Sequence, residues 1–181
     1  MGQFDSAVSF ILANEGGLSE NPNDPGGITN FGISLRFVRE IPEDRLRRYG
    51  IFEPITDATI RELTIDQAKL IYRGEFWEAV PFEKIQNQQL CNYIFDMCVN
   101  HGIAQGTKLT QRAVWACQKT VNFIKDDGVL GSKTVAAINH CSFMLIVAMM
   151  GQRDGFYRRL VALNPSRKGD LHGWLNRCYR I

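Results

Sequence analysis

Apolar residues recur at the three- and four-residue spacing of an α-helix along most of this 181-residue chain. Glycine, proline and other turn formers interrupt that pattern at intervals. Such a sequence predicts a mainly α protein built from helices of moderate length. Only residues 28–34 have the character of a short β-hairpin. The chain is long enough to bury a hydrophobic core, in one domain or in two small ones.

The first predicted helix carries a carboxylate on its apolar side. Val8 and Ile11 lie on one stripe, and Glu15 continues it just before Gly16 and Gly17 end the helix. Acidic residues seldom occupy such positions without a partner or a task. The negative end of the helix dipole and partial burial both raise a carboxyl pKa, which suits the general acid of a glycosidase. A glutamate that caps the turn or pairs with an arginine would have the same spacing.

A rigid, turn-forming loop follows this helix. Prolines stiffen the chain around Asp24, while Gly26 and Gly27 permit tight turns and close approach of a ligand to the backbone. A second carboxylate on such a loop could activate water on the opposite face of a sugar. Taken alone, however, Asp24 is better explained as the start of an Asp-Pro-Gly turn. Thr29 begins the expected hairpin, where its hydroxyl could position that water.

Helical patterning resumes after the hairpin and continues, with breaks, to the end of the chain. Residues 64–67 have the spacing of a capping box that opens a helix running to Trp77. Residues 90–101 form a further predicted helix, and residues 132–150 are expected to form one long apolar helix capped at its first residue. No internal repeat or low-complexity linker is present, and the softest boundary lies near residues 102–106.

Two polar residues in the middle of the chain are candidates for a substrate cleft. Asp96 and Asn100 lie one helical turn apart, so they could bind sugar amides together, and one of them could replace Asp24 as the second carboxylate. They could also simply tie helices together. Tyr72 has two corresponding interpretations, as a platform for a sugar ring or as a core residue.

Composition and charge argue against several classes of protein. The formal net charge of +2 does not indicate nucleic-acid binding. The longest apolar run, Cys141–Met150, is shorter than the ~20 residues of a membrane-spanning helix. The N-terminus lacks the pattern of a secretory signal. Five cysteines without a Cys-x-x-Cys pair, and three histidines that do not cluster with them, predict free thiols in a reducing compartment and no metal site. No cofactor is expected.

The C-terminal end of the chain is basic. Such an excess of positive charge favours polyanionic surfaces such as bacterial envelopes, although a solvated helix face would have the same composition. The basic residues from Gln152 onward are Arg153, Arg158, Arg159, Arg167, Lys168, Arg177 and Arg180.

Several short motifs follow one another along the chain: Glu15-Gly-Gly17, Asn23-Asp-Pro-Gly-Gly27, Thr29, Gly32-Ile-Ser34, Ala68-Lys-Leu-Ile-Tyr72, Phe76-Trp77, Phe95-Asp-Met-Cys-Val-Asn-His-Gly102, Asp127-Gly-Val-Leu-Gly131 with Thr134, and Gly173-Trp174-Leu-Asn-Arg177. Together they resemble the family 108 glycoside hydrolases with their glutamate-glycine-glycine signature. That family comprises N-acetylmuramidases of phage and prophage lysis proteins. The resemblance covers nearly the whole chain, and its last part is similar to the family's C-terminal peptidoglycan-binding region.

The resemblance implies a lysozyme-like helical fold with a small β-hairpin at the active site and a helical C-terminal region. Residues 1–105 would form the catalytic region, and residues 106–181 a peptidoglycan-binding-like region packed on it. The implied partner is the glycan strand of peptidoglycan. No exposed heptad or long edge strand is evident, so we expect a monomer.

The implied reaction is hydrolysis of the β-1,4 bond between N-acetylmuramic acid and N-acetylglucosamine, with Glu15 as the general acid. Asp24 and Thr29 carry over by motif position and would hold or activate water. Carboxyl groups roughly 6.5–9.5 Å apart would then predict inversion of configuration, whereas a separation of roughly 5 Å would predict retention. The candidate substrate-binding residues are Gly27, Tyr72, Asp96 and Asn100.

Two positions depart from the family pattern, and two other functions fit the same features. The family commonly has tyrosine at the position of Leu18 and alanine at that of Ile28. An aromatic ring at position 18 would stack on a sugar, so its loss bears on affinity rather than chemistry. A non-catalytic wall-binding or secretion-assisting protein is one alternative, and hydrolysis of chitin-like polymers is the other.

The chain is expected to be synthesised in the cytoplasm without a signal peptide. It would act on the bacterial cell wall or in the periplasm after release. A phage, a prophage and a host origin are all compatible with the sequence.

Overall fold

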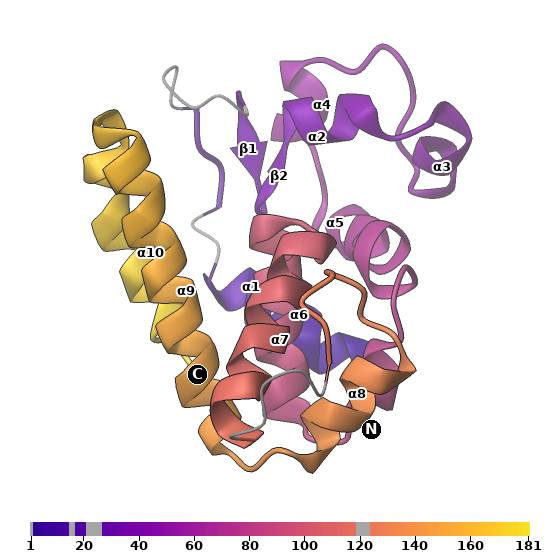
Figure 1. Cartoon of the computed structure of the whole chain (residues 1–181). Coiled ribbons are helices and arrows are strands. Elements are labelled where there is room, and N and C mark those ends of the chain that lie inside the picture. The colour runs from indigo at the N-terminus through magenta and orange to yellow at the C-terminus, as the bar shows by residue number, and fades with distance from the viewer. Residues whose placement is uncertain (1, 15–16, 21–26, 119–123) are drawn as a thin grey trace. The chain divides into compact units, whose positions relative to one another are not determined.

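The chain is mainly helical in the computed structural model, which describes residues 2–14, 17–20, 27–118 and 124–181 (Figure 1). The sheet present in these residues is a single two-stranded antiparallel one. The predicted fold class, mainly α with a small hairpin, is therefore confirmed.

The chain divides into two compact units. One consists of Val8–Glu78 and the other of Met1–Ala7 together with Ala79–Ile181. Helix α1 (Phe4–Asn14) contributes residues to both. Its apolar stripe is buried as the sequence predicted, since Val8 and Ile11 are almost inaccessible to solvent. The predicted division near residue 105 stays a prediction.

The unit Val8–Glu78 contains the hairpin and a series of short helices. They are β1 (Thr29–Asn30), β2 (Ile33–Ser34), α2 (Leu35–Glu40), α3 (Glu43–Arg48), α4 (Asp57–Arg61), α5 (Ile65–Tyr72) and a π-helical segment (Arg73–Trp77). The capping box that opens α5 is present, because the Thr64 and Gln67 side chains each accept a hydrogen bond from the other residue's backbone.

A two-residue turn joins the two strands of the hairpin, and its geometry matches the twist of paired strands. Thr29 pairs with Ser34 and Asn30 with Ile33. The turn residues Phe31 and Gly32 both have positive φ, 50° and 77°, as a type I′ turn requires. Glycine adopts this conformation without steric cost, whereas phenylalanine does so only under constraint from its surroundings.

The unit around Ala79–Ile181 is a helical bundle. Its elements are the 3-10 turn Phe82–Lys84, α6 (Gln88–His101), α7 (Ile103–Gln118), α8 (Ser132–His140), α9 (Met144–Leu163), the 3-10 segment Pro165–Asp170 and α10 (Leu171–Cys178). Helix α6 ends at Gly102, with φ 78°, as predicted. Helices α6 and α7 approach so closely at Gly106 that an added Cβ would lie 2.7 Å from the backbone nitrogen of Cys98.

The single long helix predicted over residues 132–150 is wrong. The chain leaves α8 at Cys141, which is extended, and begins α9 at Met144 after a bend of 118°. Ser142 explains the new start, because its hydroxyl accepts a hydrogen bond from the Met144 N–H and its carbonyl accepts one from the Leu145 N–H. Gly131, rather than Ser132, occupies the N-cap of α8.

Candidate functional site

The two leading candidates for chemistry, Glu15 and Asp24, lie outside the described residues. The hairpin that follows them in the sequence is described. The remaining candidates fall into two groups, one on the hairpin and its supporting helix and the other on α6.

Thr29 is held from both sides of β1. Its backbone N–H donates to Ser19 O at 2.9 Å, and its carbonyl accepts from Ser19 N–H at 2.8 Å, while Ser34 pairs with it on the other edge. The Thr29 hydroxyl donates to Gly27 O at 3.3 Å. A hydroxyl that donates to a carbonyl keeps lone pairs that can accept from a water molecule. Thr29 remains partly exposed, so such a water could reach it.

Gly27 precedes β1 in a conformation that needs glycine. Its φ is 74°, a left-handed value that side chains rarely adopt. Space is not the reason, because an added Cβ would meet only Leu35 Cβ, at an ordinary 3.9 Å. The backbone direction at Gly27 therefore sets where its carbonyl meets the Thr29 hydroxyl.

Tyr72 is buried and bonds to the hairpin turn. Its side chain is 1% exposed, and its hydroxyl donates to Phe31 O at 2.8 Å. The bond ties α5 to the strained turn residue and helps to explain how Phe31 is held at positive φ. This is the core interpretation that the sequence left open, because a buried ring offers no face to a sugar.

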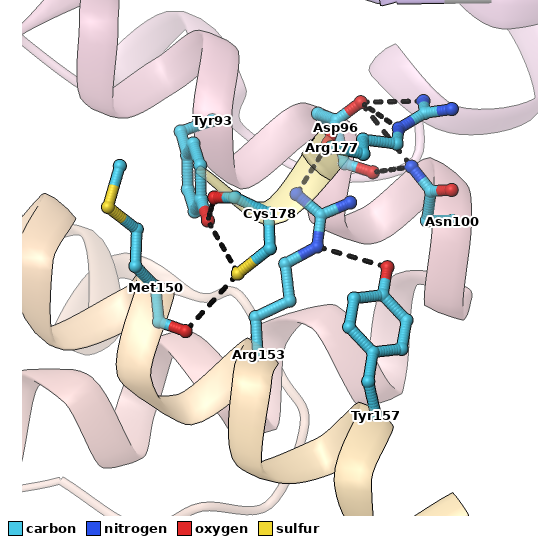
Figure 2. Close-up of polar contacts among 8 residues, drawn as sticks. All are labelled: Tyr93, Asp96, Asn100, Met150, Arg153, Tyr157, Arg177 and Cys178. Atoms are coloured by element: carbon cyan, nitrogen blue, oxygen red, sulfur yellow. Dashed lines mark hydrogen bonds and ion pairs between the residues drawn. The ribbon is translucent and has the colours of Figure 1, made fainter. Parts of the chain in front are cut away.

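Asp96 and Asn100 belong to a buried charge cluster that joins three helices (Figure 2). Arg153 of α9 places Nη1 2.8 Å from Asp96 Oδ2, and Arg177 of α10 donates from Nη2 to Oδ1 at 2.7 Å. Asn100 donates to the Asp96 backbone carbonyl at 2.9 Å and to Oδ1 at 3.3 Å. Neither Asp96 nor Arg153 has any exposed side-chain surface. The geometry matches the second interpretation given to this pair, in which it ties helices together.

Aromatic rings and the C-terminal helix enclose this cluster. The Arg153 guanidinium lies over the rings of Tyr93 and Tyr157, 5.6 and 5.7 Å from their centroids, and its Nε donates to the Tyr157 hydroxyl at 3.2 Å. Tyr93 in turn donates to Cys178 O at 2.6 Å, and the Cys178 thiol donates to Met150 O at 3.3 Å (Figure 2). These bonds attach α10 to both α6 and α9.

Arg153 is a residue whose position the sequence analysis missed. It was grouped with the basic C-terminal residues that would attract polyanionic surfaces or lie on a solvated face, but it is fully buried. A signal was present, since Arg153 lies four residues after Met149 and four before Tyr157, on the apolar side of α9. The same kind of spacing singled out Glu15 in the sequence.

His101, at the end of α6, lies against the same cluster. Its ring packs against Phe156 and Tyr157, with centroids 5.0 and 5.2 Å apart. Burial lowers the pKa of His101 to about 3, and the positive charges of Arg153 and Arg177 act in the same direction, whereas Asp96 opposes them. The imidazole is therefore neutral at neutral pH.

The Asp127-Gly-Val-Leu-Gly131 motif forms a tightly bonded loop before α8. The buried Gln111 amide donates to Asp127 Oδ1 at 2.9 Å, to Thr134 Oγ1 at 3.1 Å and to the Val129 carbonyl at 3.2 Å. Its own oxygen accepts from the Gly128 N–H at 3.0 Å. Gly128 has φ 82°, and an added Cβ would lie 2.8 Å from a backbone oxygen of α7. Gln111 was not predicted as a structural residue, although a glutamine within a helical apolar pattern is a signal for one.

Other kinds of site receive no support from the described residues. No group of three or more potential metal ligands is present in ranges 2–14, 17–20, 27–118 and 124–181. The five cysteines are free thiols, as predicted, and burial raises the pKa of Cys91 and Cys98 to about 12. In the same ranges no single helix is long and apolar enough to cross a bilayer, and α8 and α9 meet a length and composition test only as a bent pair.

Comparison with known protein families places this chain in the glycoside hydrolase class. Residues 8–102 match the family described as "Glycosyl hydrolase 108", which is more than half of the chain. The chain belongs to this family. Residues 105–179 match a second family described as "Predicted Peptidoglycan domain", which supports peptidoglycan as the partner.

A solved structure has a similar fold over nearly the whole length of the chain. It is titled "Structure of Brucella abortus SagA", with 23% sequence identity and a TM-score of 0.67. The match covers 97% of this chain and 92% of that chain. No curated protein matches this chain. The family match therefore supports a glycosidase.

Proposed function

We propose that this protein is an N-acetylmuramidase that hydrolyses the β-1,4 bond between N-acetylmuramic acid and N-acetylglucosamine in peptidoglycan. The observation that carries the proposal is the family match over residues 8–102, because that span contains Glu15, Asp24 and Thr29. The match of residues 105–179 to a peptidoglycan domain supports the same polymer as the substrate.

In the proposed reaction Glu15 protonates the glycosidic oxygen while positive charge develops at the anomeric carbon. In the same step the glycosidic bond breaks, water attacks the anomeric carbon from the opposite face, and Asp24 accepts a proton from that water, so the configuration is inverted. Thr29 would position this water through its hydroxyl. The support for this role is the way Ser19, Ser34 and the carbonyl of Gly27 hold that residue.

We also propose the wider setting of this reaction. A catalytic region would extend over residues 1–105, and a wall-binding region over residues 106–181. The protein would act as a monomeric, endolysin-like enzyme of phage or prophage type. It would be synthesised in the cytoplasm and act on the cell wall after release.

Substitution of the acid tests the proposal most directly. Glu15→Gln removes the transferable proton while keeping the shape of the side chain, so the rate of peptidoglycan clearing should fall by about 10³-fold, within the ~10²–10⁴ of a general acid. The measurement is loss of turbidity of purified peptidoglycan together with the masses of the released sugars. Exposed Glu78→Gln is the matched control and should clear the polymer at the wild-type rate.

The same experiment separates the alternatives. If the wild-type protein sediments with the wall but releases no sugar, the enzyme proposal is overturned and the non-catalytic wall-binding function replaces it. Release of sugars from chitin and not from peptidoglycan would identify the other polymer as the substrate. The anomeric configuration of the first product, read by proton NMR, tests inversion against retention.

A further inference from the structure

A cavity of about 550 Å³ lies beside the tightly bonded loop of the C-terminal bundle. This volume is in the range of small-ligand sites, roughly 300–1,000 Å³. The cavity is formed at the junction of the loop with the first turn of α8. Its lining includes Lys125, Asp127, Val129, Ser132, Lys133 and Thr134.

Hydrogen bonds hold the loop that forms one wall of this cavity. The Gln111 amide fixes the loop through the four hydrogen bonds already described, and Thr134 adds a fifth by donating to the Val129 carbonyl at 3.1 Å. Gly128 allows the loop to lie directly against α7. A preformed wall spares a ligand the entropic cost of ordering the loop.

The charges around the cavity favour an anion. Lys125 and Lys133 are both exposed, and within the described part of the chain neither forms an ion pair. Asp127 is the single acid in the lining, and its Oδ1 already accepts from the Val129 N–H at 2.9 Å and from Gln111. Hydrogen bonds from those two donors, and to a smaller extent the charge of Lys125, lower the pKa of Asp127. Its carboxylate therefore stays ionised and bonded to the loop.

Two further features select the kind of anion. No side chain caps the N-terminus of α8, since Gly131 holds that position, so backbone N–H groups and the positive end of the helix dipole are available near the lysines. Val129 is 62% exposed and gives the same cavity an apolar side. An anionic group on a short aliphatic or peptide backbone fits this combination better than a free inorganic ion does.

We propose that this cavity is a second substrate site that binds a carboxylate of the peptide attached to the glycan strand, with Lys125 and Lys133 as its cationic ligands. The proposal rests on peptidoglycan being the substrate, as proposed above, and adds which part of the polymer the C-terminal bundle recognises. Charge-assisted hydrogen bonds from the lysines would hold the carboxylate, and Val129 would contact the adjacent aliphatic carbons.

Binding of a soluble stem peptide tests the site without turnover. The protein used is the whole chain with Glu15→Gln, so that it does not cleave glycan. Isothermal titration calorimetry measures its dissociation constant for a stem peptide whose carboxylates are free. Adding Lys125→Gln and Lys133→Gln together should weaken binding at least about tenfold, since each charge-assisted bond makes a substantial contribution. Amidating the peptide carboxylates should weaken binding to the unmodified pocket by a similar factor.

A matched pair of substitutions controls for net charge. Lys84→Gln and Lys108→Gln remove an exposed and a partly exposed lysine of the same compact unit that do not line the cavity, and binding should stay within about twofold. Thermal unfolding of each variant confirms that the bundle remains folded. The proposal is overturned if the pocket pair binds as tightly as the control pair, if the amidated peptide binds equally well, or if no stem peptide binds.

Failure of this site is distinguishable from failure of the muramidase function. Release of sugars by the wild-type protein reports the reaction alone, whereas the titration reports the cavity alone. Peptide binding without sugar release overturns the muramidase proposal and leaves the cavity supported. Sugar release without peptide binding supports the muramidase proposal and overturns the proposed peptide site in the cavity.

Discussion

The hairpin and the buried charge cluster show two ways in which polar residues are used in this protein. The strands of the hairpin pair residues that are close in the sequence, with one longer-range bond from Tyr72 to the turn, and Thr29 remains partly exposed. The cluster joins Asp96 to Arg153 and Arg177, which lie 57 and 81 residues further along the chain. The side chains of Asp96 and Arg153 have no exposed surface. Polar groups near solvent are available for chemistry, whereas the cluster is part of the architecture.

The energetic consequence of this contrast is that damage to each region should show in a different measurement. A buried charge that loses its partner is costly because neither water nor a counter-ion compensates it. A polar side chain at the edge of a hairpin can be replaced with little effect on folding. Substitutions in the cluster should therefore change stability, and substitutions in the hairpin should change turnover.

The largest effect is expected from Asp96→Asn. The change leaves two guanidinium groups without their counter-ion, so the free energy of unfolding should fall by about 3–5 kcal/mol, as when one partner of a buried pair is removed. Urea denaturation followed by circular dichroism measures it. Asp170→Asn, which breaks the exposed pair with Arg167, should cost less than about 1 kcal/mol. Equal losses of unfolding free energy in the two variants would mean that the buried cluster contributes no more to stability than an exposed ion pair.

The next effect concerns pH and His101. Its pKa of about 3 in the folded protein lies below the ordinary value of 6.5, so between these pH values the unfolded chain binds the proton and the folded one does not. Stability is then full above about pH 6.5 and falls as the pH drops. From pH 7 to pH 5 this residue should account for a loss of about 2 kcal/mol.

Replacement of the ring tests this assignment. His101→Phe keeps an aromatic ring against Phe156 and Tyr157 but does not titrate, so it should remove that part of the pH dependence. Urea midpoints at pH 5 and pH 7 give the comparison, with exposed His172→Gln as the control. A wild-type pH dependence in His101→Phe would assign the effect to other groups.

A smaller effect, in turnover rather than stability, is expected from Thr29→Val. The two side chains have the same shape, but valine cannot hydrogen-bond to water or to the Gly27 carbonyl. We expect the rate of sugar release to fall roughly tenfold, equivalent to ~1.4 kcal/mol in the barrier. The free energy of unfolding should change by less than about 1 kcal/mol. A variant that is destabilised in proportion to its lost activity would contradict the separation of the two regions.

The smallest effect is expected at the hairpin turn. Phe31→Asn places the residue that a type I′ turn prefers before Gly32, which should relieve a left-handed strain of about 1 kcal/mol. Thermal unfolding should therefore show a small rise in the midpoint temperature. The loss of phenylalanine contacts acts in the opposite direction, so a fall in the midpoint would show that packing, rather than conformation, decides this position.

Many elements of the fold follow from local chemistry and were predicted for that reason. The capping box at Thr64 and Gln67, the end of α6 at Gly102 and the hairpin over residues 28–34 each depend on residues a few positions apart. The break between α8 and α9 was missed because the apolar pattern continues across it. Ser142 was the local sign of a new helix start.

The candidate site was predictable only in part. The spacing of Glu15, Asp24 and Thr29 came from sequence motifs, and the described structure adds how the last of these is held. Sequence alone left Asp96 and Tyr72 with two interpretations each. Their burial and their partners, which lie far away along the chain, distinguish the two.

By itself the sequence determined the helical class, the hairpin, the free thiols and the family, because these depend on periodicity, turn residues and ordered motifs. Only the tertiary structure decided that Arg153 is a buried counter-ion and not part of a basic surface. It also decided that Gln111 organises the loop beside the cavity. The physical reason is that the sequence shows the chemical type of a charged or amide side chain. Its partner and its exposure to water depend on how helices far apart in the sequence pack together.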